Sequence, residues 1–377
     1  MTVPDPIQAA MDQAVRDGVF PGAILAVRLG GVLRRITRSG RLSTDPPGEP
    51  VQSSTIYDLA SLTKPLVTVT STLLLVQSGK LALDMPIRTI LVDLEGAPVG
   101  SARLRDLLTH SAGLPGWRPL YERLEPTAGL KDRTVPGSVR QSVLRLIRDE
   151  PLIYERGTRS LYSDLGFILL GMAVERAGGM SLDKYFEVTV AGPLQARPLL
   201  FAPAAAASSP AATLPVDLSM IAPTEWSDGR ARLLRGEVHD DNAAAMGGVA
   251  GHAGLFGTAE AVLTVSGAWL RAYCGQSSIL DSELVREFTG RQSYVPQSSW
   301  ALGWDTPTAQ SSSGRYFSAD SFGHLGYTGT SLWIDPQREL EVVLLSNRVH
   351  PSHKNEKIRE FRPVVHDLAY REFVSAG

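Results

Sequence analysis

The chain has 377 residues, of which 43% are hydrophobic and 20% charged, and its formal charge is −2 at pH 7. This composition is typical of a globular chain with enough apolar residues for one or two packed domains. The near-neutral balance provides no basic field for nucleic acid and no cationic face for a membrane, so we expect neither as a partner. The single cysteine, Cys274, excludes an internal disulfide, and its place at a helix end predicts burial as a small hydrophobe.

Residues 1–10 contain neither the basic segment nor the apolar segment that secretory signals have, which predicts a cytoplasmic protein. A helix is predicted over residues 6–17, where an apolar side chain recurs at every fourth position. The runs 22–29 and 32–39 are rich in strand-forming residues, and Gly30-Gly31 between them predicts a two-residue hairpin.

From about residue 80 to residue 291 the apolar spacing is mostly helical. Helices are expected over residues 101–110, 139–150, 164–178 and 258–269. The Ala/Ser/Pro-rich segment 201–215 has no such period and predicts a surface loop. Strand patterns return at 330–335 and 339–345, and a last helix is predicted over 363–373.

The two ends of the chain therefore resemble each other, because each carries a helix and a hairpin. The simplest arrangement is an α+β fold in which residues 1–79 and 292–377 build one antiparallel sheet flanked by helices. Residues 80–291 would then form an inserted, mainly helical domain, with the active site between the two parts.

Ser61 and Lys64 stand three residues apart at the start of an apolar stretch that Gly79 ends. On a helix, residues at this spacing share a face, so Lys64 could take the Ser61 proton if burial lowers the pKa of its amine. The same spacing recurs at Ser181 and Lys184, where Ser181 is most simply a helix N-cap. A capping role is therefore the alternative for Ser61 as well.

Four side chains could supply metal ligands, namely His239, Asp240, Asp241 and His252. They lack the Cys pair or helical His pair that metal sites usually contain, which favours a hydrogen-bonded loop instead. We expect neither a metal nor another cofactor.

Three further residues carry useful chemistry, and each has a structural alternative. Tyr162 precedes a helix and could shuttle a proton beside Lys64, or could be a half-buried aromatic residue. Asp164 could simply favour a helix N-terminus by its charge. His324 stands before a Gly-rich strand entry, where substrate can approach a strand edge, or is a surface histidine.

Taken together, Ser61-Leu62-Thr63-Lys64, Tyr162-Ser163-Asp164 and His324-Leu325-Gly326 resemble the three motifs of the serine β-lactamase and penicillin-binding-protein-like family. The chain is most similar to the class C β-lactamases and to the carboxylesterases and peptidases related to them. The phrases at 104–115 and 302–304 also fall where this family has them, so the resemblance covers nearly the whole chain. The segment 238–256 resembles a subgroup with cell-wall amidase-like and penicillin-binding-like members.

This resemblance implies that Ser61 is the acylated nucleophile and that Lys64 and Tyr162 handle its proton. It also implies an oxyanion hole made by the Ser61 N–H and a strand N–H near Thr328. The substrate-binding residues that it implies are Asp164, His324, Gly326, Thr328 and Arg348.

Two departures from the family pattern concern the substrate. His324 stands where β-lactamases carry Lys, and Asp164 stands where they carry Asn. The first removes a cation and the second adds an anion, so efficient β-lactam hydrolysis is not expected. An unperturbed imidazole, with a pKa of ~6.5, would become charged on acidification. Arg348 is a candidate for the missing cation, with a surface salt bridge as its alternative.

The sequence therefore predicts a serine hydrolase that acts through an acyl-enzyme on a small ester or amide, with a peptidoglycan fragment as one candidate. The alternatives are a true class C-like β-lactamase and a catalytically silent relative that binds a ligand. The presence of Ser61, Lys64 and Tyr162 favours an enzyme, because a binding protein would not need all three.

Overall fold

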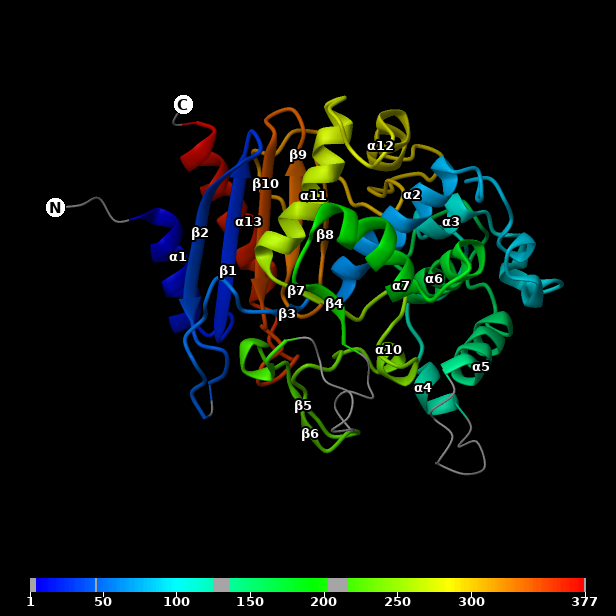
Figure 1. The fold of residues 1–377 in the computed structure, drawn as a ribbon, viewed down its shortest axis with the longest axis horizontal. Coiled ribbons are helices and arrows are strands. Elements are labelled where there is room, and N and C mark those ends of the chain that lie inside the picture. Colours follow the sequence, from blue (N-terminus) through cyan, green and yellow to red (C-terminus); the bar gives the residue numbers. More distant parts are fainter. Residues whose placement is uncertain (1–4, 45, 125–135, 203–215, 376–377) are drawn as a thin grey trace.

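A computed structural model describes residues 5–44, 46–124, 136–202 and 216–375. Its centre is a five-stranded antiparallel sheet with the strand order β2-β1-β10-β9-β8, in which strands from the two ends of the chain lie side by side (Figure 1). The predicted α+β fold, with one sheet built from both chain ends, is confirmed.

The strands are β1 (Gly22–Leu29), β2 (Val32–Gly40), β3 (Tyr57–Asp58), β4 (Leu199–Phe201), β5 (Trp226–Ser227), β6 (Arg232–Leu233), β7 (Leu255–Gly257), β8 (Phe322–Leu325), β9 (Ser331–Asp335) and β10 (Leu340–Ser346). The helices are α1 (Pro6–Arg16), α2 (Thr70–Gln77), α3 (Leu104–Leu108), α4 (Leu120–Arg123), α5 (Pro136–Arg148), α6 (Asp164–Gly178), α7 (Leu182–Phe186), α8 (Gly192–Leu194), α10 (Asp241–Ala245), α11 (Ala259–Tyr273), α12 (Ser282–Thr289) and α13 (Ile358–Phe373). Short helical turns are η1 (Ala60–Leu62), η2 (Lys64–Val69), η3 (Ile87–Thr89), η4 (Val92–Leu94), η5 (Pro98–Ser101), η6 (Glu187–Ala191) and η7 (Leu218–Met220).

The inner strands β1, β10 and β9 are buried on both faces, whereas the edge strand β2 is exposed over much of its length. In β1, alternate side chains such as Leu25 and Val27 join a core under α1 and α13, whereas Ile24 and Ala26 face the larger core on the other side. This follows from the twofold side-chain period of a strand. The larger core continues into the helical part of the chain, where α2, α3 and α6 pack together.

Helices α1, α11 and α13 pack on the faces of the sheet. Helices α1 and α13 contact each other, α1 packs against β2 and α13 against β10, and α11 packs against β10 and β1 (Figure 1). Helix α11 belongs to the predicted helical insertion, residues 80–291, yet it lies on the sheet. The same insertion contributes β4 and β7, which form a small sheet with β3 just before the Ser61 segment.

At three places the structure differs from the predicted local structure. The last helix begins at Ile358, and Pro363 lies inside it, because Ile358 and Phe361 are buried in the core and outweigh the lost hydrogen bond. Cys274 is exposed, because α11 ends at Tyr273 and the chain turns out to solvent. The helix expected over 101–110 spans only α3 and is preceded by the turn η5.

Two further predictions concern loops and turns. The hairpin at Gly30 and Gly31 is present, and both residues have the positive φ values, 58° and 74°, that such a turn needs. Most of the predicted loop at 201–215 lies outside the described residues.

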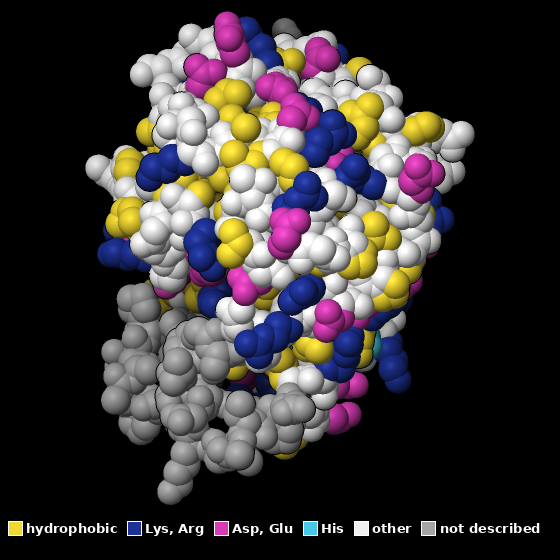
Figure 2. Space-filling view, turned by 90° about the vertical axis from the view of Figure 1, so that its right-hand side faces the viewer, with side chains coloured by type: hydrophobic (Ala, Val, Ile, Leu, Met, Phe, Trp, Pro, Cys, Tyr) yellow, Lys and Arg dark blue, Asp and Glu magenta, His cyan; other side chains and the backbone are white. Residues whose placement is uncertain are grey.

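No single helix in the described part of the chain is long and apolar enough to cross a membrane; only the bent pair Asp164–Gly178 and Leu182–Leu194 reaches that length and composition together. The face on the helical side of the molecule carries basic, acidic and apolar side chains mixed over its surface rather than gathered by type (Figure 2).

Candidate active site

Ser61 lies in a tight turn that Asp58 holds in place. Ala60, just before it, has a φ of 47°, which is uncommon for a residue with a side chain and marks a strained backbone. The buried Asp58 carboxylate accepts the Ala60 N–H through Oδ1 and the His239 N–H through Oδ2, both at 2.8 Å. Asp58 thereby fixes the turn that presents Ser61 and ties it to the His239 segment, a function that sequence reasoning missed.

Replacing Asp58 by Asn should therefore weaken both the turn and the fold. An amide can accept only one of the two N–H groups, and its own NH₂ then faces the other. An unpaired buried donor costs about 1–3 kcal/mol, so we expect Asp58→Asn to lower the free energy of unfolding by that amount and to lower kcat. Urea denaturation measures the first effect and ester kinetics the second. An unchanged urea midpoint together with an unchanged kcat would show that Asp58 does not hold the turn.

Lys64 lies one helical turn beyond Ser61, on the same helix face as predicted. Its side chain is fully buried. Its Nζ donates to three acceptors: Ser61 Oγ at 2.9 Å, Asp164 Oδ1 at 2.6 Å and the His252 carbonyl at 3.2 Å. Three acceptors match the three N–H bonds of an ammonium group. The predicted Ser61–Lys64 pair is thus formed, with Asp164 as an ion-pair partner.

The charge state of Lys64 differs from the one that the sequence suggested. Burial lowers the pKa of Lys64, but the Asp164 carboxylate and the Tyr162 phenol raise it by more, so it ends above its ordinary value of 10.5. The condition set for Lys64 to take the Ser61 proton, a pKa lowered by burial, is therefore not met, because Asp164 compensates the buried charge. The ion pair with Asp164 thus favours the charged form of Lys64.

Tyr162 is buried beside this pair. The Lys64 Nζ lies 4.7 Å from the centre of its ring, and the His110 and Trp300 rings pack around it, at 4.6 Å and 5.7 Å between centroids. Burial raises the pKa of Tyr162 above 10.0 although Lys64 lowers it, so the hydroxyl stays protonated at neutral pH. This buried hydroxyl interacts with Lys64 and Ser61, which places it between the two groups that would exchange a proton.

His324 lies on β8, an edge strand of the sheet, with its ring centre 6.0 Å from that of Tyr162. Its Nδ1–H donates to the Leu325 carbonyl at 2.8 Å, which leaves Nε2 as a buried acceptor. Burial, and secondly the charge of Lys64, lower the pKa of His324 to about 3. The expectation that mild acid would charge this ring is therefore wrong, and His324 is a neutral group at any ordinary pH.

Gly326 and Thr328 shape the strand edge opposite Ser61. A Cβ on Gly326 would lie 2.7 Å from the Leu59 carbonyl and 2.0 Å from Thr330 Oγ1, so only glycine fits there. Thr328 is buried, donates through Oγ1 to the Asp58 carbonyl at 2.7 Å and lies outside the residues that line the cavity. The side chain that borders the cavity in this loop is that of Tyr327.

Two buried arginines bring positive charge to the site. Arg348 donates to the Tyr327 carbonyl at 2.8 Å and lies over the Tyr327 ring, and Arg362 donates to the Gly326 and Thr330 carbonyls, both at 2.8 Å. Neither forms a salt bridge with an acidic residue in the described part of the chain. Burial, and then Arg348 and Arg359, lower the pKa of Arg362 to about 9.

The four candidate metal ligands instead form separate hydrogen-bonded pairs. His239 Nε2 lies 2.7 Å from Glu225 Oε1, and His252 Nε2 lies 2.8 Å from Asp240 Oδ1. Asp241 pairs with Arg230. Within the described ranges, no three His, Cys, Asp or Glu side chains are grouped so that they could hold a metal ion.

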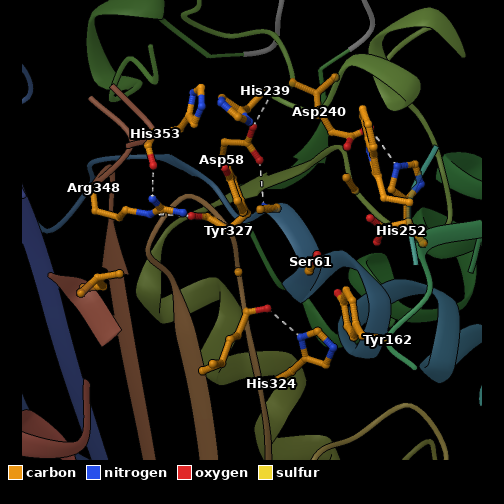
Figure 3. Close-up of a pocket in the computed structure, with 18 of the residues that line it drawn as sticks. Asp58, Ser61, Tyr162, His239, Asp240, His252, His324, Tyr327, Arg348 and His353 are labelled. Atoms are coloured by element: carbon orange, nitrogen blue, oxygen red, sulfur yellow. Dashed lines mark hydrogen bonds and ion pairs between the residues drawn. The ribbon is translucent and has the colours of Figure 1, made fainter. Parts of the chain in front are cut away.

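Most of the side chains described above line one cavity of about 740 Å³. Figure 3 shows Tyr162 and His324 on one side of Ser61, with Arg348 and His353 on the other. Of the predicted site residues, Ser61, Tyr162, Asp164, His324, Gly326 and Arg348 line the cavity, and Lys64 lies buried behind Ser61. Sequence reasoning missed Asp58, His110, Trp300, Tyr327 and Arg362, which line the cavity or pack against its wall. Of these, only His110 lay in a phrase that the family resemblance had singled out.

The chain is also similar to known proteins. A family model described as "Beta-lactamase" matches residues 7–365. A Salmonella agona protein named "Putative D-alanyl-D-alanine carboxypeptidase" is 31% identical over 324 residues, which cover 81% of this chain and 72% of that protein.

Solved structures share the fold. EstCE1, described as a hydrolase with promiscuous acyltransferase activity, superposes with a TM-score of 0.73 at 22% identity and covers 97% of both chains. Simvastatin synthase (LovD) from Aspergillus terreus does so with a TM-score of 0.71 at 19% identity and covers 98% of both. The match over nearly all of the chain, together with the Ser61–Lys64–Tyr162 geometry, confirms the resemblance seen in the three motifs: the chain belongs to the β-lactamase family of serine hydrolases.

Proposed function

We propose that this protein forms an acyl-enzyme on Ser61 and hydrolyses a small ester or amide. The observation that carries the proposal is the 2.9 Å contact between Lys64 Nζ and Ser61 Oγ at the wall of a cavity that Tyr162 also lines. Such a group of nucleophile, amine and phenol supports attack on an acyl carbon and protonation of the leaving group.

The substrate we favour within this class carries a carboxylate, as a peptidoglycan fragment with a free C-terminus does. Arg348 and Arg362 are buried cations that border the cavity without a carboxylate partner in the described ranges. A buried cation is stabilised by an opposite charge, and a substrate carboxylate would supply it. The carboxypeptidase name of the Salmonella relative agrees with this choice.

A panel of substrates tests the proposal. Peptides ending in D-alanyl-D-alanine, muramyl peptides, p-nitrophenyl esters and nitrocefin are assayed side by side with the same enzyme preparation. We expect measurable turnover of the esters and release of a C-terminal residue from at least one peptide. Absence of turnover on every ester and amide, with intact folding, would instead favour a ligand-binding relative.

A true β-lactamase is the second candidate, because the two arginines could also hold the carboxylate of a β-lactam. We expect nitrocefin nevertheless to be a poor substrate relative to a neutral ester. A neutral His324 donates no charge-assisted hydrogen bond, and such bonds are roughly twice as strong as neutral ones.

His324→Lys should therefore raise the ratio of nitrocefin to p-nitrophenyl ester kcat/KM by about tenfold, which corresponds to about 1.4 kcal/mol. The ratio cancels any general loss of catalysis, and His324→Gln serves as the neutral control. An unchanged ratio in His324→Lys, or faster hydrolysis of nitrocefin than of any ester by the wild type, would assign carboxylate binding to Arg348 or Arg362 instead.

A further inference from the structure

Asp164 is placed to do more than bind substrate. Its Oδ1 lies 2.6 Å from Lys64 Nζ, which is the same nitrogen that donates to Ser61 Oγ. A side chain in this position can exchange a proton with the lysine directly. The Asn that β-lactamases carry at this position, as the family resemblance implies, has no such capacity.

The resting state contains no ready base for Ser61. Lys64 Nζ donates to three acceptors, and its ion pair with Asp164 favours the ammonium form, while burial favours the protonated phenol of Tyr162. The neighbouring imidazoles do not help. His110 accepts the Ser163 N–H through Nδ1, His324 donates through Nδ1 to a carbonyl, and burial lowers the pKa of both rings.

The other carboxylates described at this site are already engaged. Asp240 is paired with His252, and on the far side of the cavity Glu225 is paired with His239. Asp58 is occupied by two backbone N–H groups. Asp164, whose side chain is 17% exposed on the cavity wall, is therefore the carboxylate that directly contacts Lys64.

We propose that Asp164 is the proton acceptor that turns Lys64 into the base for Ser61. This inference rests on the proposed acyl-enzyme function. Nζ passes a proton to Asp164 Oδ1, which leaves a neutral amine and a carboxylic acid. The amine then takes the Ser61 proton while Oγ bonds to the acyl carbon and the carbonyl electron pair becomes the oxyanion.

The remaining steps return every proton. When the tetrahedral intermediate collapses, its bond to the leaving group breaks and the leaving group takes a proton from the Lys64 ammonium, directly or through the Tyr162 hydroxyl. Asp164 then returns its proton to Lys64, which restores the ion pair. The enzyme needs no proton from solvent and loses none to it during acylation.

This pathway predicts the direction of a pH effect. With Asp164 present, the reactive enzyme is the ion pair itself, so no proton has to leave for solvent before Ser61 is activated. In Asp164→Asn the amine becomes a base only by losing its proton to solvent. The acid limb of kcat/KM should therefore move to higher pH in the variant.

If Asp164 were only a counter-ion, the direction would be opposite. The wild-type pair would have to lose a proton before Lys64 could act, and its acid limb would follow the raised pKa of Lys64. Removing the carboxylate would lower that pKa, and the limb would move to lower pH in Asp164→Asn. The direction in which the acid limb of kcat/KM moves in Asp164→Asn thus distinguishes the two roles of Asp164.

The experiment measures kcat and KM from about pH 5 to about pH 10 for hydrolysis of p-nitrophenyl acetate, a small neutral ester with no amide for residue 164 to bind. We expect kcat/KM of Asp164→Asn to be about 10²-fold lower than wild type near pH 6 and to approach it at alkaline pH, with little change in KM. Asp164→Glu, which keeps the carboxylate, should keep the wild-type limb. Formate should partly rescue Asp164→Ala near pH 6, because it supplies a carboxylate through the open cavity.

Three results would overturn the inference: an acid limb in Asp164→Asn at the same pH as wild type or lower, an equal loss at every pH, or an effect confined to KM. Fluorophosphonate labelling of Ser61 in the wild type separates this failure from failure of the proposed function. Labelling without the pH shift rejects Asp164 as proton acceptor and keeps the acyl-enzyme. No labelling rejects both.

Discussion

Ser61→Ala should lower kcat for ester hydrolysis by about 10⁶-fold, the size of loss seen when the serine of an acyl-enzyme pathway is removed. Ser61 Oγ is the serine oxygen that Lys64 contacts. The change removes one oxygen from a partly exposed side chain, so stability should hardly change. Kinetics on a p-nitrophenyl ester, with thermal unfolding as the check on folding, measure the effect.

Ser181→Ala is the matched control. Ser181 has the same spacing to Lys184, and it stands just before helix α7 as the capping prediction requires, but its exposed side chain makes no cap hydrogen bond and lies outside the cavity. We expect unchanged kcat and unchanged stability. Loss of activity in Ser181→Ala with an active Ser61→Ala would exchange the two assignments.

Tyr162→Phe should lower kcat by about 10²–10⁴-fold, the range for a lost general acid or base. The hydroxyl is buried and interacts with Lys64 and Ser61, which also contact each other directly, so its removal leaves neither of them unpaired. Stability should therefore stay the same or rise slightly while both acylation and deacylation slow. Stopped-flow kinetics resolve the two steps.

Lys64→Ala should show a similar loss of kcat but a different stability effect, because it leaves Asp164 without its cation. Turnover close to wild type in Tyr162→Phe, on an ester that the parent enzyme hydrolyses, would exclude the phenol from proton transfer. Lys64 would then have to serve the leaving group alone.

Much of the fold could be predicted because the local patterns agree with the long-range packing. Gly30 and Gly31 specify a hairpin turn by their own backbone conformations. The alternating side chains of residues 22–29 have a core on each face of the sheet. The Ser61–Lys64 contact follows from helical spacing alone. Such features depend on residues close in sequence.

The features that could not be predicted depend on distant parts of the chain. The burial of Ile358 and Phe361 lets a helix run through Pro363, and no local signal reports that burial. Arg362, on the same helix, reaches the Gly326 carbonyl only because α13 packs beside β10. Likewise, β8 was missed because Phe322–Leu325 becomes a strand through its pairing with β9.

The charge states of the site also depend on parts of the chain that are distant in sequence. The sequence places Lys64 and His324 near a site, but their pKa values depend on burial and on Asp164, which lies 100 residues away from Lys64 in sequence. A raised pKa for Lys64 and a lowered one for His324 reverse the expectations drawn from the isolated side chains. The chemistry of this site is therefore a property of the fold.

Covalent labelling tests most directly whether Ser61 is the activated nucleophile. The protein is treated with a fluorophosphonate, its intact mass is measured, and the labelled peptide is sequenced by mass spectrometry while residual esterase activity is followed. We expect one adduct, on Ser61, formed in parallel with the loss of activity and absent from Ser61→Ala. An adduct on another residue such as Ser181, or full ester hydrolysis by protein whose Ser61 is labelled, would contradict this account.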